Sequence, residues 1–432
     1  MLDGRTIRTS SGRKVFFLVG AASAALLLVS LGSAQAPVPV THSLTVIRHE
    51  KTDLTDARAN QILREASRAL GADDDGPGNG GALDDRPCAV TLARSGAVGT
   101  FAENQAPAVI LTKSDWNKLS ALTGWVKIVQ RVKWCSGPTS KAIGCGSTPG
   151  RSFALTRQAS TIEFKLWAHE FGHNTGLGHN QVNGRAIMNQ GAVSYKREVS
   201  ASECVSYRAG APRGIFGPPM AQSKATSPRM RVTDFVRTTW VEGLPYEQAR
   251  SYSRSDASVL LKLLEGAKPA PVSNIFATLA AIGDPRAVDP MIRHMTAPAG
   301  DNLTSDEVGD RTGIPISLGW LANRTGDRRA LELLQAGMMP SYWTVERLPW
   351  VARSSDDLRS IQLEMAVASA MGLALAGRRA PAEAFTHVAK TVRGLSPGDA
   401  DRFHEALEEA REIRGSVALS GLARFYASTR TR

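Results

Sequence analysis

Histidine, cysteine and aromatic residues are all scarce in this chain. Its 432 residues include eight histidines, four cysteines and 6% aromatic side chains. No two cysteines stand at C-x-x-C spacing, which argues against zinc held by thiolates. Charged residues form no block of five or more of one sign, so the net charge of +12 indicates a solvated basic surface, and no nucleic-acid partner is expected. A hydrophobic share of 42% is typical of a globular protein and excludes a disordered or multi-span membrane chain.

One long apolar run stands at the N-terminus. Arg5, Arg8, Arg13 and Lys14 precede the apolar residues 15–31, and small residues follow, which is the layout of an export signal with cleavage after Ala34. We therefore predict that residues 1–36 are a signal peptide or, if uncleaved, a membrane anchor. In both cases the rest of the chain lies outside the cytoplasm, secreted or anchored to the outer side of the membrane.

The four cysteines all fall between positions 88 and 204 of this exported chain, so two disulfides are expected. Cys135 and Cys145 flank the segment SGPTSKAIG and could close it as a loop. That would leave Cys88 to pair with Cys204, although four cysteines permit three connectivities.

Residues 42–208 show a mixed α/β pattern and are predicted to form one domain. A sheet carrying a helix is expected, followed by a second helix that contains most of the clustered histidines. The predicted strands are 43–50, 88–94, 108–112, 126–134 and 151–155, and the first helix is 55–70. Between helix and second strand lies a Gly- and Asp-rich loop, which could hold Ca²⁺ through Asp73, Asp75 and Asn79 or be a flexible solvated loop without an ion.

The second half of the chain has a different pattern. Residues 209–230 are rich in Pro, Gly and Ser and are predicted to be a linker, and residues 231–432 are helical almost throughout. Within them an apolar helix, a Gly-containing turn with Arg and a further helix recur at 276–295, 316–337 and 366–388. The turn Gly283–Arg286, G-D-P-R, resembles HEAT-like repeats, which implies an α-helical repeat domain with a concave surface that binds a protein or cell-envelope partner.

Other conspicuous side chains of the second half are assigned to packing. Trp320, Trp343 and Trp350 are expected to pack between helices. His294, His387 and His404 are expected to be surface or core polar residues without a metal.

The segment AHEFGHNTGLGHN, residues 168–180, holds three of the eight histidines. On a helix, His169 and His173 lie one above the other on one face and can hold one metal ion. Glu170 lies one step round the helix, where it can contact a water on that ion. Gly176 permits a left-handed turn that returns His179 to the same ion. Three histidines and one water make an open, catalytic type of zinc site.

The helix that carries this segment has a sequence signal for its start. Ser160 and Glu163 stand three residues apart in STIE, the spacing of a capping box, so the helix is predicted to begin near Thr161.

Together with AIMN, which ends at Asn189, the segment HEFGHNTGLGH resembles the signature and Met-turn of the metzincin zinc endopeptidases. The resemblance implies an α+β fold with a five-stranded mixed sheet and an active-site helix. It also implies one Zn²⁺ held by His169, His173 and His179, with Glu170 as general base and acid, Gly176 at the turn and Met188 beneath the metal. The spacing to Met188 is most similar to matrixins, but Asn180 after the third histidine leaves the subfamily open.

The resemblance also bears on the substrate, which would be a protein or peptide. An extended peptide would pair with the edge strand of the sheet, which we expect to be 151–155. Tyr195 is a candidate for the wall of the specificity pocket. The function predicted is an exported zinc metalloendopeptidase. Two alternatives stay open: a secreted helical-repeat binding scaffold with a weak or inactive protease domain, and a zinc hydrolase that acts on a non-peptide substrate.

Overall fold

The computed structural model describes residues 38–71, 88–180, 183–191, 198–211, 230–265, 271–300, 303–354 and 356–429. Four predictions lie outside these residues: the export signal, the Ca²⁺ site of Asp73, Asp75 and Asn79, the pocket residue Tyr195, and most of the linker. Residues 38–211 are called the first region below, and residues 230–429 the helical region. Both belong to one compact unit, Pro37–Arg432. Among the described helices, none is long and apolar enough to cross a membrane.

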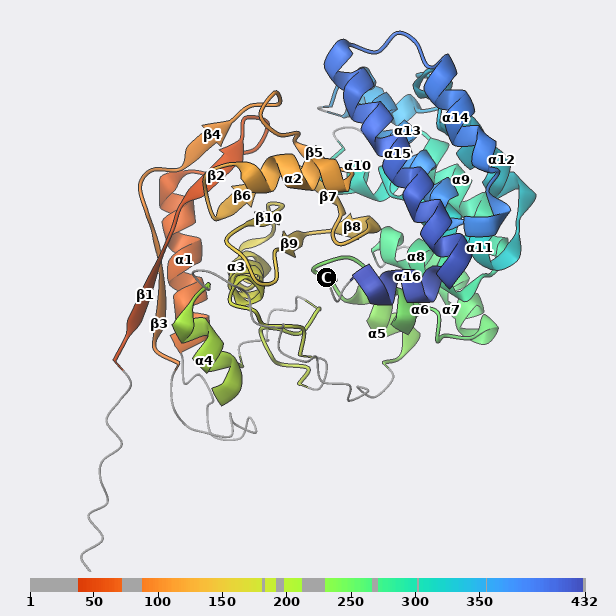
Figure 1. Cartoon of the computed structure of the whole chain (residues 1–432). Helices are drawn as coiled ribbons and strands as arrows, with labels where there is room; N and C mark the ends of the chain where they lie inside the picture. Colours follow the sequence, from red (N-terminus) through yellow and green to blue (C-terminus); the bar gives the residue numbers. More distant parts are fainter. Residues whose placement is uncertain are drawn as a thin grey trace, which may run out of the picture. The chain divides into compact units, whose positions relative to one another are not determined.

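A five-stranded mixed sheet lies at the centre of the first region (Figure 1). Its order is β4-β2-β6-β10-β9, and every neighbouring pair is parallel except β10 and β9. The edge strand next to the histidine helix is therefore antiparallel to the rest. The strands are β2 (Val46–His49), β4 (Gly99–Phe101), β6 (Val126–Ile128), β9 (Gly144–Gly146) and β10 (Phe153–Leu155).

Two smaller sheets extend the first region. The first pairs β1 (Val40–Leu44) with β3 (Val90–Arg94) in parallel, and β1 continues into β2 after a break at Thr45. The second has the order β5-β7-β8 and consists of β5 (Val109–Ile110), β7 (Arg131–Trp134) and β8 (Pro138–Ala142).

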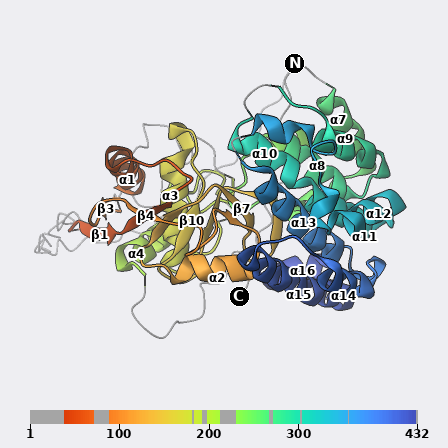
Figure 2. The same ribbon diagram turned by 90° about the horizontal axis from the view of Figure 1, so that it is seen from above.

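Helices of the first region cover the sheet. They are α1 (Asp56–Gly71), α2 (Lys113–Ala121), α3 (Ser160–Asn174) and α4 (Ala201–Ala209). Helix α3 is seen end-on in Figure 1 and lengthwise in Figure 2, and it contacts α1, β9 and β10. Ile62 and Leu63 of α1 and Leu166 and Trp167 of α3 are buried in one apolar core with β2 and β6. This packing fixes the helix that carries the histidines.

Several predicted elements need correction. The predicted strand 126–134 is two strands, β6 and β7, which belong to different sheets. The expected loop between Cys135 and Cys145 contains β8 and the start of β9, because the segment pairs as strands on both sides. The expected edge strand 151–155 is the inner strand β10, and β9 forms the edge instead. The segment SGPTSKAIG contains residues that favour turns, so its pattern predicted a loop and gave no sign of the two short strands.

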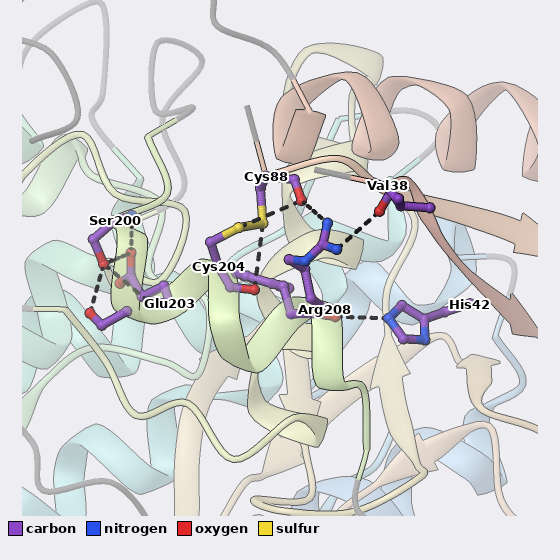
Figure 3. Close-up of a disulfide and its surroundings, with 9 residues drawn as sticks. Val38, His42, Cys88, Ser200, Glu203, Cys204 and Arg208 are labelled. Atoms are coloured by element: carbon purple, nitrogen blue, oxygen red, sulfur yellow. Dashed lines mark hydrogen bonds between the residues drawn. A yellow bond between two sulfur atoms is a disulfide. The ribbon is translucent and has the colours of Figure 1, made fainter. Parts of the chain in front are cut away.

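Both expected disulfides are present, Cys88–Cys204 and Cys135–Cys145. The first joins the residues before β3 to α4, and Arg208 on α4 donates to the carbonyl oxygens of Cys88 and Val38 (Figure 3). His42 lies 2.8 Å from the carbonyl oxygen of Tyr207 on the same helix. The N-terminal strand, β3 and α4 are thus held together. Disulfides of this kind form in oxidising compartments outside the cytoplasm.

The helical region has helices throughout its described parts. The α-helices are α5 (Val232–Arg237), α6 (Tyr246–Ala249), α7 (Arg254–Leu264), α8 (Val272–Ile282), α9 (Val288–Thr296), α10 (Ser305–Thr312), α11 (Ile314–Thr325), α12 (Arg328–Gly337), α13 (Leu358–Leu375), α14 (Ala382–Thr391), α15 (Pro397–Ser420) and α16 (Leu422–Thr429). Short 3₁₀ turns stand at Pro285–Ala287, Pro340–Tyr342, Pro349–Arg353 and Gly377–Arg379.

The three predicted helix–turn–helix units are found as α8/α9, α11/α12 and α13/α14. Gly283 ends α8 with φ +80°, and Asp284 caps the turn that follows, as the G-D-P-R pattern predicts. Helix α11 contacts α8 and α13, and a Cβ on Gly319 would meet the backbone of Gly372 within 3.0 Å. The backbones of α11 and α13 therefore cross closely. Trp320 and its two companions Trp343 and Trp350 are buried, as expected of packing residues.

Candidate metal centre

Helix α3 brings two of the histidines into the interior. From Glu163 to Asn174 every side chain of α3 is buried. The helix begins at Ser160, but the predicted capping box is absent, because Ala159 is the N-cap and makes no side-chain cap. The Glu163 carboxylate instead accepts hydrogen bonds of 2.6 Å from each of Arg58 and Arg157. The end of α3 is fixed by Asn174, whose amide donates to the carbonyl oxygens of Ser147 and Ser152 beside β9 and β10.

The third histidine returns through the turn that the glycine predicts. Gly176 has φ +92°, a conformation that favours glycine, and its amide donates to the carbonyl of His173. The amide of Leu177 donates to the carbonyl of Gly172, which closes the turn at the end of the helix. The chain reverses there, so His179 comes to lie beside the two helical histidines.

The Nε2 atoms of the three histidines converge. Nε2 of His173 lies 3.1 Å from Nε2 of His169 and 3.2 Å from Nε2 of His179. A tetrahedral zinc ion with bonds of about 2.0–2.1 Å to imidazole nitrogens has its ligand atoms about 3.3–3.4 Å apart. The observed separations are close to those edges. The cluster is buried and could hold a metal ion, and both its donor type and its spacing are compatible with zinc.

The hydrogen bonds of the Nδ1 atoms show which tautomer is present in His169 and His173. Nδ1 of His169 and Nδ1 of His173 each lie 2.8 Å from a backbone carbonyl oxygen, of Ile187 and Leu177 respectively. A carbonyl only accepts, so these Nδ1 atoms carry the protons and the Nε2 atoms present lone pairs. Nδ1 of His179 lies 3.1 Å from the side-chain amide of Gln190, which supports the third ring. Gln190 was not predicted, since it lies after the Met-turn and outside the signature.

Glu170 is fully buried between the metal cluster and the edge strand. Neither carboxylate oxygen has a hydrogen-bond partner among the described residues. A Cβ on Gly144 or Gly146 of β9 would come within 3.0 Å of these oxygens, so the two glycines make the space that the carboxylate fills. Burial raises the pKa of Glu170 well above its usual range, and the negative charge of Glu242 raises it further. This environment favours a carboxylate that takes up a proton.

Met188 and Asn180 hold the chain around the third histidine. The Met188 side chain is buried against Gly172 of α3, and the Tyr207 hydroxyl of α4 lies 3.1 Å from its sulfur. The Asn180 amide donates to the Glu203 carboxylate at the start of α4. These contacts join the turn after His179 to α3 and α4, and they give Asn180 a structural role that the signature alone did not indicate.

One carboxylate at the cluster comes from beyond the predicted linker. The Glu242 oxygens lie 3.4 Å from Nε2 of His173 and 3.3 Å from Nε2 of His179. Its side chain is 15% exposed, and it forms a second potential metal-binding group with Glu170 and His173. Glu242 was not predicted as a site residue, because this residue lies in no motif and falls in the part of the chain assigned to the helical domain.

Of the predicted site residues, His169, Glu170, His173 and His179 are brought together, with Gly176 and Met188 placed around them. The four cysteines form two disulfides and leave no free thiol as a ligand. No model of a known protein family matches this chain, and a search of curated proteins finds no match. The signature residues and their geometry therefore carry the functional assignment.

Proposed function

We propose that this chain is an exported, zinc-dependent endopeptidase. The observation that carries the proposal is the convergence of three histidine Nε2 atoms beside a buried carboxylate that has no other partner among the described residues. The Nδ1 atoms of His169 and His173 carry the protons, so their Nε2 lone pairs suit zinc. Three histidine ligands leave a position open for chemistry. The two disulfides are consistent with an exported protein.

A zinc ion held by the three histidines would supply a Lewis acid that polarises a carbonyl and lowers the pKa of a water. Glu170 is placed to accept a proton from that water and to return it to the leaving amine. Its carboxylate lies within 4.8 Å of the ligand nitrogen of His173, and burial makes the protonated form accessible. Gly144 and Gly146 hold this carboxylate in place against β9.

The edge strand supports a peptide as the substrate. β9 lies at the edge of the sheet and contacts α3, so an extended chain that pairs with β9 would pass beside Glu170 and the histidines. Main-chain pairing binds peptides with little regard to side chains, which suits an endopeptidase.

The test combines metal analysis with proteolysis. We expect about one zinc per purified chain, loss of that zinc in His173→Ala, and its retention in Glu170→Ala. Cleavage of casein should fall on the order of 100-fold or more in Glu170→Ala, since general base catalysis contributes roughly that much. A purified chain without zinc, or cleavage that Glu170→Ala leaves unchanged, would overturn the proposal.

A further inference from the structure

The backbone of Trp240–Leu244 meets the edge strand β9 at its first residue, Gly144. The Val241 carbonyl accepts hydrogen bonds from the amides of Ile143 (2.8 Å) and Gly144 (3.1 Å). On its other side, the Val241 amide donates to the Gln190 carbonyl (2.9 Å), and Trp240 pairs with Gly191 in an antiparallel bridge. The segment thus lies between the edge strand and the loop after Met188, where an extended substrate would pair by strand addition.

Two side chains of this segment pack into different cores, one in the first region and one in the helical region. Val241 is 1% exposed and belongs to the apolar core of the first region. Trp240 belongs to the core of the helical region, where its ring contacts Phe235 and its Nε1 donates to the Phe235 carbonyl. Gly243 has φ +88°, and a Cβ there would come within 3.0 Å of the Thr139 hydroxyl. The backbone at Glu242 is therefore fixed on both sides.

The Glu242 carboxylate completes a set of four donors. Its oxygens lie 3.3 and 3.4 Å from two of the ligand nitrogens, about the spacing between the histidine nitrogens themselves. A carboxylate oxygen is an ordinary zinc ligand, and four protein ligands fill a tetrahedral ion. A site filled in this way has no position left for water.

We propose that Glu242 is the fourth protein ligand of the metal, and that Trp240–Leu244 occupies, as a tethered segment, the place beside Gly144 where an extended substrate would pair. The chain in this conformation is then self-blocked, and the basal cleavage of the wild type comes from the fraction of chains whose segment has left this place. This inference rests on the proposed function, since it concerns the regulation of the same site.

The experiment compares the wild type with Glu242→Gln, which keeps the shape of the side chain and removes its charge. Glu247→Gln is the matched control, because Glu247 lies five residues further on and forms an exposed ion pair with Arg250. Zinc affinity is measured by competition with a chromogenic chelator, and the ligand set by the visible spectrum of the cobalt(II)-substituted chain, before and after addition of acetohydroxamate.

We expect Glu242→Gln to bind zinc about tenfold or more weakly, since even outer-shell changes cost roughly 10- to 100-fold. Its cobalt spectrum should differ from that of the wild type and should shift when acetohydroxamate is added, whereas the wild-type spectrum should not. Casein cleavage should rise at least about tenfold, because the metal gains an open position. Glu247→Gln should match the wild type in every measurement.

The outcomes separate the two proposals. Equal zinc affinity and equal cobalt spectra in Glu242→Gln and wild type would overturn the ligand role of Glu242, while the endopeptidase proposal stands. An altered spectrum without a gain in cleavage would overturn the blocking role. Absence of zinc from both chains would overturn the proposed function instead. If Glu242→Gln folds poorly, Glu242→Asp provides the second variant: its shorter carboxylate should weaken zinc binding and admit acetohydroxamate, and wild-type behaviour would count against the inference.

Discussion

The first region and the helical region meet at two junctions of opposite character. At the charged junction, β7 and β8 face α10, α13 and Asp356, which precedes α13. Arg131 makes ion pairs of 2.7 Å with Glu364 and 2.8 Å with Asp356, and Lys133 donates to the Gly309 carbonyl. At the metal junction, Glu242 faces two histidines and the buried carboxylate Glu170.

The two junctions differ in whether the protein's own side chains balance the buried charges. Burial lowers the pKa of Arg131, but Glu364 and Asp356 outweigh it and the net shift is upward. Burial likewise raises the pKa of Glu364, yet Arg131 and Lys133 hold it below its usual value. At the metal junction, burial and Glu242 together raise the pKa of Glu170. The charged junction is thus balanced by side chains of the protein, whereas at the metal junction a bound cation would supply the compensating charge.

Breaking the charged junction should have the largest effect on stability. Arg131→Met leaves Glu364 and Asp356 without their main cation, and removing one partner of a buried ion pair costs about 3–5 kcal/mol. The free energy of unfolding should fall by that amount in urea titrations at pH 7. The control is Arg328→Met, whose ion pair with Glu332 is exposed to solvent and should contribute little to stability. Equal losses in both variants would show that the charged junction adds no special stability.

The substitution Gly243→Ala should disrupt the metal junction although it replaces none of the proposed metal ligands. Both Gly243 (φ +88°) and Gly394 (φ +82°) have a backbone conformation that disfavours alanine, but only Gly243 has a neighbour in the way of a Cβ. Gly394→Ala should therefore cost about 1 kcal/mol of unfolding free energy. Gly243→Ala should cost about 2–3 kcal/mol and also weaken zinc binding, because it displaces Glu242. A Gly243→Ala chain with unchanged zinc affinity would argue against the link between this glycine and the metal.

The two junctions also mark the limit of what the sequence predicts. His169, His173, Gly176 and His179 are close in sequence, and helical pitch with one glycine turn is enough to place them together. Glu242 reaches the same cluster only through the packing of Trp240 and Val241 into two different cores, which no local pattern encodes. The edge strand β9 also could not be predicted from a local pattern. It is short and pairs through its backbone, and its glycines give no alternation of apolar residues that would indicate a strand.

In the helical region, too, local features could be predicted from the sequence and long-range contacts could not. The pattern around Gly283 and Asp284 predicted the turn correctly, because both residues act locally as helix stop and cap. The charged junction could not be predicted, since Arg131 and Glu364 are far apart in sequence and each looks like an ordinary surface charge. The preferred disulfide pairing followed from the short segment between Cys135 and Cys145, which left Cys88 to pair with Cys204 among three possible connectivities, and the structure contains this pairing.

The smallest effect should be the pH dependence of the charged junction. The folded pKa of Glu364 lies below its unfolded value of 4.5, so its contribution to stability is present above pH 4.5 and is lost as the pH falls through the folded pKa. In Arg131→Met, the same carboxylate stays buried without its guanidinium partner, which raises its folded pKa, so acid should relieve part of the damage. The gap in unfolding free energy between wild type and Arg131→Met should therefore narrow between pH 6 and pH 3, as measured by urea titration at each pH. A gap that stays constant over this range would mean that Glu364 does not depend on Arg131 for its charge, and that the charged junction is held by packing instead.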